Sequence, residues 1–176
     1  MKQKLIITLV LPLLLTGCMN EFESIFDGNN ADAIAPLTKQ ESGEAAPFLY
    51  DDYDSFSRLA GSVLSDAGAP RGDDYAMIIN DKSLLKDLVV DEETTLSWPE
   101  IDFNKYSLII GRFCTTSQGY RVENQRVVKK AGNVELYLEI VSSSFGHLES
   151  PAVYSFGALY PKLPDCPVVI KRWNNY

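Results

Sequence analysis

The chain has 176 residues, which is enough for one globular domain and a terminal segment, and its 24 acidic against 16 basic residues give a net charge of −8. An acidic protein is repelled by nucleic acid and by anionic lipid surfaces, and the sequence contains no basic patch, so the charge argues against nucleic-acid binding. The hydrophobic share of 45%, with nine Tyr and eight Phe, is typical of a domain rich in strands.

The N-terminus begins with Lys2 and Lys4, continues with an apolar run over residues 5–15, and reaches Cys18 through Thr16 and Gly17. A basic start, a short apolar run and a cleavage site with a small residue predict a signal peptide over residues 1–17. The run is shorter than the roughly 20 apolar residues that a membrane-spanning helix needs, and Pro12 lies inside it. The alternatives are an uncleaved or buried N-terminal helix, or an ordinary secretory signal in which Cys18 has no role.

The sequence Leu14-Leu15-Thr16-Gly17-Cys18 resembles the lipobox of bacterial lipoproteins. This resemblance implies a diacylglycerol on Cys18, which becomes the first residue of the mature chain, usually with a third acyl chain on its amino group. Two or more acyl chains give stable membrane anchoring. We therefore expect a lipid-anchored protein of the bacterial cell envelope. The outer membrane is favoured because Met19 stands where enteric lipoproteins retained at the inner membrane carry Asp; the periplasmic and surface faces both stay open.

Residues 18–46 are rich in acidic residues and contain the breakers Gly28-Asn29-Asn30 and Ser42-Gly43. Such a segment buries too little apolar surface to offset its ordering entropy, so the sequence predicts a flexible tether with a span of roughly 30 Å. The alternative is a short amphipathic turn formed by Phe22, Ile25 and Phe26.

Residues 47–176 are predicted to form a single α+β domain with a mainly antiparallel sheet. Apolar residues at helical spacing predict a helix over 54–64, capped by Asp54. A second, short helix is expected from Asn80 and Asp81, with Leu84, Leu85 and Leu88 on one face. Alternating or continuous apolar runs predict six strands, over residues 75–79, 106–113, 120–128, 134–141, 152–160 and 168–173.

Several short motifs over residues 75–173 resemble a known family. They are Ile101-Asp102-Phe103, Leu108-Ile109-Ile110-Gly111, Thr116-Ser117-Gln118-Gly119-Tyr120, Tyr160-Pro161-Lys162 and a final strand over 167–171. Their order is similar to the C-terminal domain of PrcB-like protease-complex subunits and to uncharacterised lipoproteins of the Bacteroides type. Gln118 replaces the first of two adjacent glycines that the family loop tends to carry. The resemblance implies a non-catalytic lipoprotein that binds or stabilises a surface protease.

Candidate chemical sites in the sequence are weak. His147, with Ser142–Ser144 and Glu149 nearby, suggests a hydrolase triad, but there is no Gly-x-Ser-x-Gly elbow and an exposed loop histidine explains it better. Asp51-Asp52-Tyr53-Asp54 could hold calcium, although a solvated turn or helix cap is the simpler interpretation. One histidine and two further cysteines in separate segments argue against structural zinc. We therefore expect no catalytic residue, no metal and no cofactor.

Cys114 and Cys166 are candidates for a disulfide, because the compartment beyond a signal peptide is oxidising. A bridge requires the strands 106–113 and 168–173 to be antiparallel neighbours; the alternative is two buried free thiols.

The leading functional hypothesis is a non-catalytic lipoprotein anchored through Cys18 that binds a protein partner in the envelope. The alternative is a carbohydrate- or small-ligand-binding lipoprotein, in which exposed aromatic rings stack on the ligand; in strands such rings more often belong to the core. The aromatic candidates are Trp98, Trp173, Tyr154, Phe156 and Tyr160.

Overall fold

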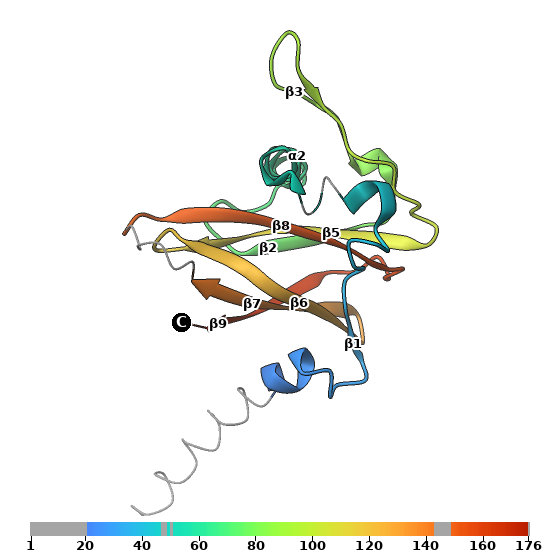
Figure 1. Ribbon diagram of the computed structural model, residues 1–176, viewed down its shortest axis with the longest axis vertical. Coiled ribbons are helices and arrows are strands. Elements are labelled where there is room, and N and C mark those ends of the chain that lie inside the picture. The colour runs from blue at the N-terminus through green and yellow to red at the C-terminus, as the bar shows by residue number, and fades with distance from the viewer. Residues whose placement is uncertain (1–20, 47–48, 50, 143–148, 176) are drawn as a thin grey trace, which may run out of the picture.

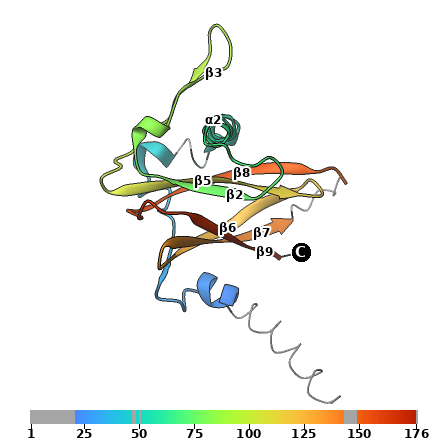
Figure 2. The ribbon, with the colours of Figure 1, turned by 180° about the vertical axis from the view of Figure 1, so that it is seen from behind.

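The computed structural model describes residues 21–46, 49, 51–142 and 149–175. Two sheets lie face to face, helix α2 (Tyr53–Asp66) covers the outer face of one sheet, and a short helix of residues 21–26 covers the outer face of the other (Figures 1 and 2). The fold is α+β, as the sequence predicts.

The sheet beneath α2 is antiparallel and has the strand order β2-β5-β8 (Tyr75–Ile79, Tyr106–Thr115 and Ala152–Pro161). The central strand, β5, carries Leu108-Ile109-Ile110, which is fully buried because α2 packs on one side of it and the second sheet on the other. A continuous apolar run is therefore what a strand covered on both faces requires.

The second sheet has the order β1-β6-β7-β9 (Ala33–Ile34, Tyr120–Lys130, Asn133–Ser142 and Val168–Asn175). β6 and β7 form an antiparallel hairpin, whereas β9 runs parallel to β7. All six predicted strands are confirmed. The parallel pair is a departure from the antiparallel expectation, and it arises because the chain crosses to β8 in the other sheet before it returns as β9.

Helix α2 packs on β5 and β8 through a face made of Phe56, Leu59, Ala60, Val63 and Leu64. The predicted helix is confirmed, but its cap is Asp52 rather than Asp54: the Asp52 Oδ1 accepts a hydrogen bond from the Ser55 N–H at 3.2 Å. The Phe56 ring lies directly over Gly157, where an added Cβ would come within 2.5 Å of the ring. A glycine in β8 thus allows the helix to approach the sheet.

Residues 21–46 do not form the free tether that their composition predicts. Ile25 is 1% exposed in a cluster with Val128 and Tyr137, and β1 pairs with β6. A 3-10 helix, Gly43–Ala45, then buries Ala45 in the cluster beneath α2. The segment runs along the edges of both sheets and belongs to the domain.

The short helix expected after Asn80 is reduced to one 3-10 turn, Lys82–Leu84, capped by Asp81. The polar stretch that follows contains a small hairpin, β3 (Leu88–Val89) and β4 (Thr95–Leu96), which projects beyond α2 (Figure 1). Among the residues that the structure describes, no helix is long and apolar enough to cross a membrane.

The strand arrangement proposed for a Cys114–Cys166 bridge is wrong. β5, which carries Cys114, lies between β2 and β8, and β9 pairs with β7 in the other sheet. Both cysteines are free thiols in the structure.

Candidate binding groove

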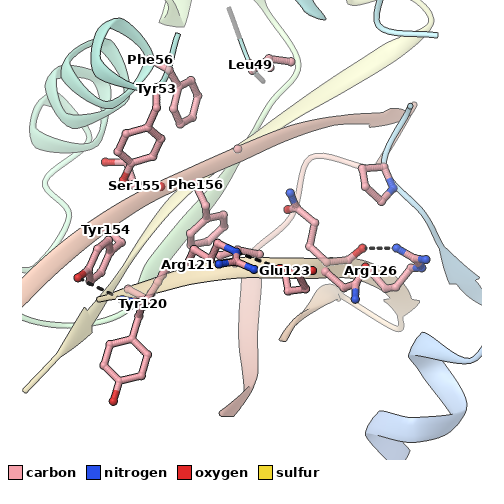
Figure 3. Close-up of a pocket in the computed structure, with 16 residues that line it drawn as sticks. Leu49, Tyr53, Phe56, Tyr120, Arg121, Glu123, Arg126, Tyr154, Ser155 and Phe156 are labelled. Carbon is pink, nitrogen blue, oxygen red and sulfur yellow. Dashed lines mark hydrogen bonds and ion pairs between the residues drawn. The ribbon is translucent and has the colours of Figure 1, made fainter. Parts of the chain in front are cut away.

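A groove of about 630 Å³ opens between the edges of β6 and β8, at one side of the sandwich (Figure 3). The N-terminal end of α2 and the segment around Pro36 and Leu49 form its remaining walls. The residues that line it are Pro36, Leu49, Tyr53, Phe56, Phe113, Tyr120, Arg121, Val122, Glu123, Asn124, Gln125, Arg126, Tyr154, Ser155, Phe156 and Gly157.

The two sides of the sandwich differ in how they are closed. On the side opposite the groove, Arg172 of β9 forms an ion pair with Asp74 beside β2, with Nη1 and Oδ1 3.2 Å apart, and donates to the Cys114 carbonyl oxygen at 2.8 Å. On the groove side, β1 pairs with β6 only at Val127 and Val128. Residues 120–126 of β6 therefore pair with β7 on one side and have no strand on their outer edge within the described part of the chain, and the groove opens along this edge.

The free edge of β8 faces the groove. The Ser155 carbonyl oxygen accepts a hydrogen bond from the Tyr53 hydroxyl at 3.3 Å, and the Leu159 carbonyl oxygen accepts one from the Leu37 N–H at 2.7 Å. Because both carbonyls bond outside the sheet, the odd-numbered residues of β8 direct their backbone groups away from β5. The backbone of Leu37 thus covers this edge at Leu159, and the Tyr53 side chain covers the Ser155 carbonyl oxygen.

Aromatic rings form the floor of the groove. The rings of Phe113 and Tyr154 stack at 5.1 Å between centroids, and Phe156 lies 6.4 Å from Phe113. The Tyr154 hydroxyl oxygen accepts a hydrogen bond from the Gly119 N–H at 2.8 Å, which fixes the ring against the β5–β6 loop. Phe156 lies over Gly111, where an added Cβ would also meet the Tyr75 carbonyl oxygen at 2.7 Å.

The polar wall comes from β6, where a bulge between Val122 and Asn124 inserts Glu123 as an extra residue. Glu123 forms an exposed ion pair with Arg121 at 2.9 Å, and the Arg126 Nη1 donates to the Gln125 carbonyl oxygen, also at 2.9 Å. An exposed ion pair contributes about 0–1 kcal/mol, so a ligand can replace the Arg121–Glu123 pair at small cost.

Burial, more than any neighbouring charge, raises the pKa of the Tyr53 hydroxyl above its ordinary value. The side chain therefore stays a neutral hydrogen-bond donor at physiological pH. Tyr53 is nevertheless 52% exposed and is not a core residue, so its ring can turn away from Ser155 without disturbing the packing of the core.

The aromatic residues singled out in the sequence separate into three places. Tyr154 and Phe156 line the groove, and Tyr160 is buried between the sheets with its hydroxyl donating to the Gln125 side-chain oxygen at 3.2 Å. Trp98 packs against Phe56 beneath α2, whereas Trp173 lies by Phe22 on the far face of the other sheet. The two tryptophans cannot form one stacking surface.

The acidic run that was a calcium candidate has structural roles. Asp51 pairs with Lys39 at 2.6 Å, and Asp52 caps α2. In the described ranges no three His, Cys, Asp or Glu side chains gather as metal ligands would. Cys18 and His147 lie outside the described residues.

Sequence reasoning missed Tyr53 and the polar residues of β6 as groove residues. Their spacing carries no motif, and the bulge that turns Glu123 into the groove leaves no signature in the alternation of this strand. In comparisons with protein-family models, with curated proteins and with solved structures, no match to the chain was found. The PrcB-like resemblance therefore stays a prediction.

Proposed function

We propose that this protein is a non-catalytic lipoprotein of the bacterial envelope, anchored through Cys18, whose groove receives an extended segment of a protein partner such as a surface protease. The observation that carries the proposal is the free edge of β8 around Ser155, which faces a groove with an aromatic floor. Unpaired backbone groups on an edge strand are a template for a further strand, and alternate side chains of that strand then enter pockets.

The incoming strand would pair with residues 153–157 of β8. Its backbone N–H would take the place of the Tyr53 hydroxyl on the Ser155 carbonyl oxygen. Side chains on one face would meet Tyr154 and Phe156, and those on the other would meet Gly157 at the foot of α2. Backbone hydrogen bonds to β8 would provide affinity, and contacts of the partner's side chains with the groove would provide selectivity.

Ser155→Pro is the substitution that tests strand addition. Proline lacks the N–H and places its ring on the edge, while the bonds from β8 to β5 come from the even-numbered residues and are kept. The matched control is Ser155→Ala, which keeps the edge backbone and loses only the contact with the Ser57 hydroxyl. Both variants are first compared with the native protein by circular dichroism and urea unfolding.

The readout is photo-crosslinking in intact cells, with the crosslinker at Val153, which is 59% exposed on this edge, or at Val169, which is 38% exposed on β9. We expect one recurring protein to crosslink from Val153 and not from Val169. The crosslink should persist in Ser155→Ala and fall at least tenfold in Ser155→Pro. An equal crosslink yield in the two variants, with the fold intact, would reject strand addition.

The anchor is tested separately by Cys18→Ala. Cys18→Ala removes the site of acylation, so we expect unlipidated protein, either as precursor retained through its apolar N-terminal run or as cleaved protein released in soluble form. Tight fractionation with membranes at high salt of variant protein from which residues 1–17 have been removed would show that the lipid does not hold the protein.

A second candidate function is the binding of a carbohydrate or another small ligand. It is favoured by Tyr53, Tyr120 and Tyr154, which line a groove whose volume of about 630 Å³ suits a small molecule. Binding of a glycan that Tyr53→Ala weakens and Ser155→Pro leaves unchanged would support this alternative over strand addition.

A further inference from the structure

The helix of residues 21–26 is fixed on the outer face of the β1-β6-β7-β9 sheet. Ile25 is fully buried there, and the Phe22 ring lies 5.3 Å from the Tyr137 ring and 6.2 Å from the Trp173 ring, between centroids. The Tyr137 hydroxyl donates to Glu21 Oε1 at 2.6 Å. The chain is therefore held to the domain from Glu21 onward.

Glu21 lies only three residues after Cys18 in the sequence. Consecutive Cα atoms are 3.8 Å apart, so this connection reaches at most about 11 Å even when fully extended. A flexible tether over residues 18–46 would instead have spanned roughly 30 Å. The packing of Ile25 thus removes most of the distance that a flexible tether would place between the lipid and the domain.

Resting on the proposed lipidation of Cys18, we propose that the protein lies close against the bilayer in one orientation, with the helix of residues 21–26 and the sheet beneath it turned toward the lipid. The layers of the sandwich are then stacked parallel to the membrane. Helix α2 and the β3–β4 hairpin lie at the opposite end of the molecule, and both views of the ribbon agree on this (Figures 1 and 2).

The charge of the lipid-facing side determines how the contact is made. Glu21, Glu23 and Asp27 are exposed on and beside the short helix. Carboxylates are repelled by anionic headgroups over a Debye length of about 8 Å at physiological ionic strength, so this face touches the headgroup layer without entering it. The acyl chains supply the attraction, and the short connection supplies the orientation.

This orientation has a consequence for the groove. Because the groove opens between the two sheets, it faces sideways along the membrane, within reach of a neighbouring membrane protein. The β3–β4 hairpin, with Val89 71% exposed, projects away from the lipid. A partner that is itself membrane-attached would approach the groove without either protein leaving the bilayer.

The two tryptophans of the chain provide the test, because they lie in different layers. Trp173 contacts Phe22 in the lipid-facing layer, whereas Trp98 contacts Phe56 of α2. Sheets stack about 10 Å apart and α2 adds a further layer, so Trp98 lies roughly 20 Å farther from the lipid. Trp98→Phe leaves Trp173 as the only donor, and Trp173→Phe leaves Trp98; phenylalanine keeps an aromatic ring at each place.

The lipidated full-length variants are reconstituted into phosphatidylcholine vesicles that carry a dansyl headgroup, and energy transfer from tryptophan to dansyl is measured. We expect transfer from Trp173 to be several-fold more efficient than transfer from Trp98. In the matched control, an insertion of about 12 Gly and Ser residues between Asn20 and Glu21 should make the two efficiencies nearly equal.

Three outcomes would overturn the inference, and they separate it from the proposed anchor. Equal transfer in protein that floats with the vesicles rejects the orientation and leaves the anchor standing. A difference that the insertion does not reduce shows that the short connection is not its cause. Failure of the lipid-processed protein to float with the vesicles rejects the anchor, and the orientation falls with it.

Discussion

Replacing Ile25 with alanine measures how firmly the N-terminal segment belongs to the domain. The side chain is 1% exposed, packed with Val128 and Tyr137, and the substitution removes three carbon atoms. At about 0.8 kcal/mol per buried methylene, the lost burial is about 2.4 kcal/mol, and incomplete collapse of the cavity raises the cost toward the range of about 2–5 kcal/mol. Because the short helix can detach by itself, the loss is limited by its docking free energy, and we expect about 2 kcal/mol.

The assay is urea unfolding of the soluble chain that begins after Cys18. With an m-value of about 2 kcal/mol per M, the midpoint should fall by about 1 M. Glu23→Ala is the control, because Glu23 is exposed on the same helix and its loss should change the midpoint little. Limited proteolysis should cut Ile25→Ala within residues 21–46 before the rest of the domain. A midpoint that Ile25→Ala leaves unchanged would mean that the segment is a tether after all.

Three further outcomes are expected. The fully buried Ser107 hydroxyl donates to Asn80 Oδ1 at 2.5 Å and accepts from the Leu163 N–H at 2.8 Å. Ser107→Ala leaves both groups without this partner, so it should lower the free energy of unfolding in urea by about 2 kcal/mol. Burial first, and then hydrogen bonds to Glu21 and Glu135, raise the pKa of the Tyr137 hydroxyl in the folded protein. The unfolded state therefore ionises first, and the free energy of unfolding falls as the pH rises above about 10. Tyr137→Phe should make that fall less steep. Unreduced, denatured mature protein should show two titratable thiols besides the lipidated cysteine, and one disulfide would contradict the strand order.

The strands of the sandwich could be predicted because each carries a local signal that tertiary packing then uses. Leu108-Ile109-Ile110 is apolar at every position, and β5 is covered on both faces. In β7, Leu136, Leu138 and Ile140 alternate with other residues, and these three point between the sheets. Helix α2 likewise followed from apolar residues at helical spacing. In these segments local preference and global environment agree.

The docking of the N-terminal segment could not be predicted, because the contacts that stabilise it are made with distant strands and not within the segment. Its acidic composition favours disorder, and the apolar residues Phe22, Ile25 and Phe26 oppose it. Those residues bind a surface that β6, β7 and β9 create together, with Tyr137 and Trp173 as contacts. Such a surface exists only after strands more than a hundred positions along the chain have paired. The parallel pairing of β9 with β7 is hidden for the same reason, since neighbouring β8 lies in the other sheet.

The candidate groove depends on which strand edges stay free, and this is a property of sheet order rather than of sequence. Tyr154 and Phe156 were identified as ligand candidates from their aromatic character, but the same argument also selected Tyr160, which is buried between the sheets. Nothing in the sequence places Tyr53 beside Ser155, about a hundred residues away. The groove could therefore be recognised only once the order of the strands was known.

The two edges that border the groove are protected to different degrees. An unprotected edge invites pairing with other chains, and proteins block it with bulges and charged residues. β6 carries both, since a bulge follows Val122 and the ion pair of Arg121 with Glu123 lies on its exposed stretch. The edge of β8 around Ser155 has the Tyr53 hydroxyl, a single half-exposed donor bound at 3.3 Å. A backbone N–H of a partner strand can replace this single weak hydrogen bond. We therefore expect a partner strand to pair with β8 rather than with β6.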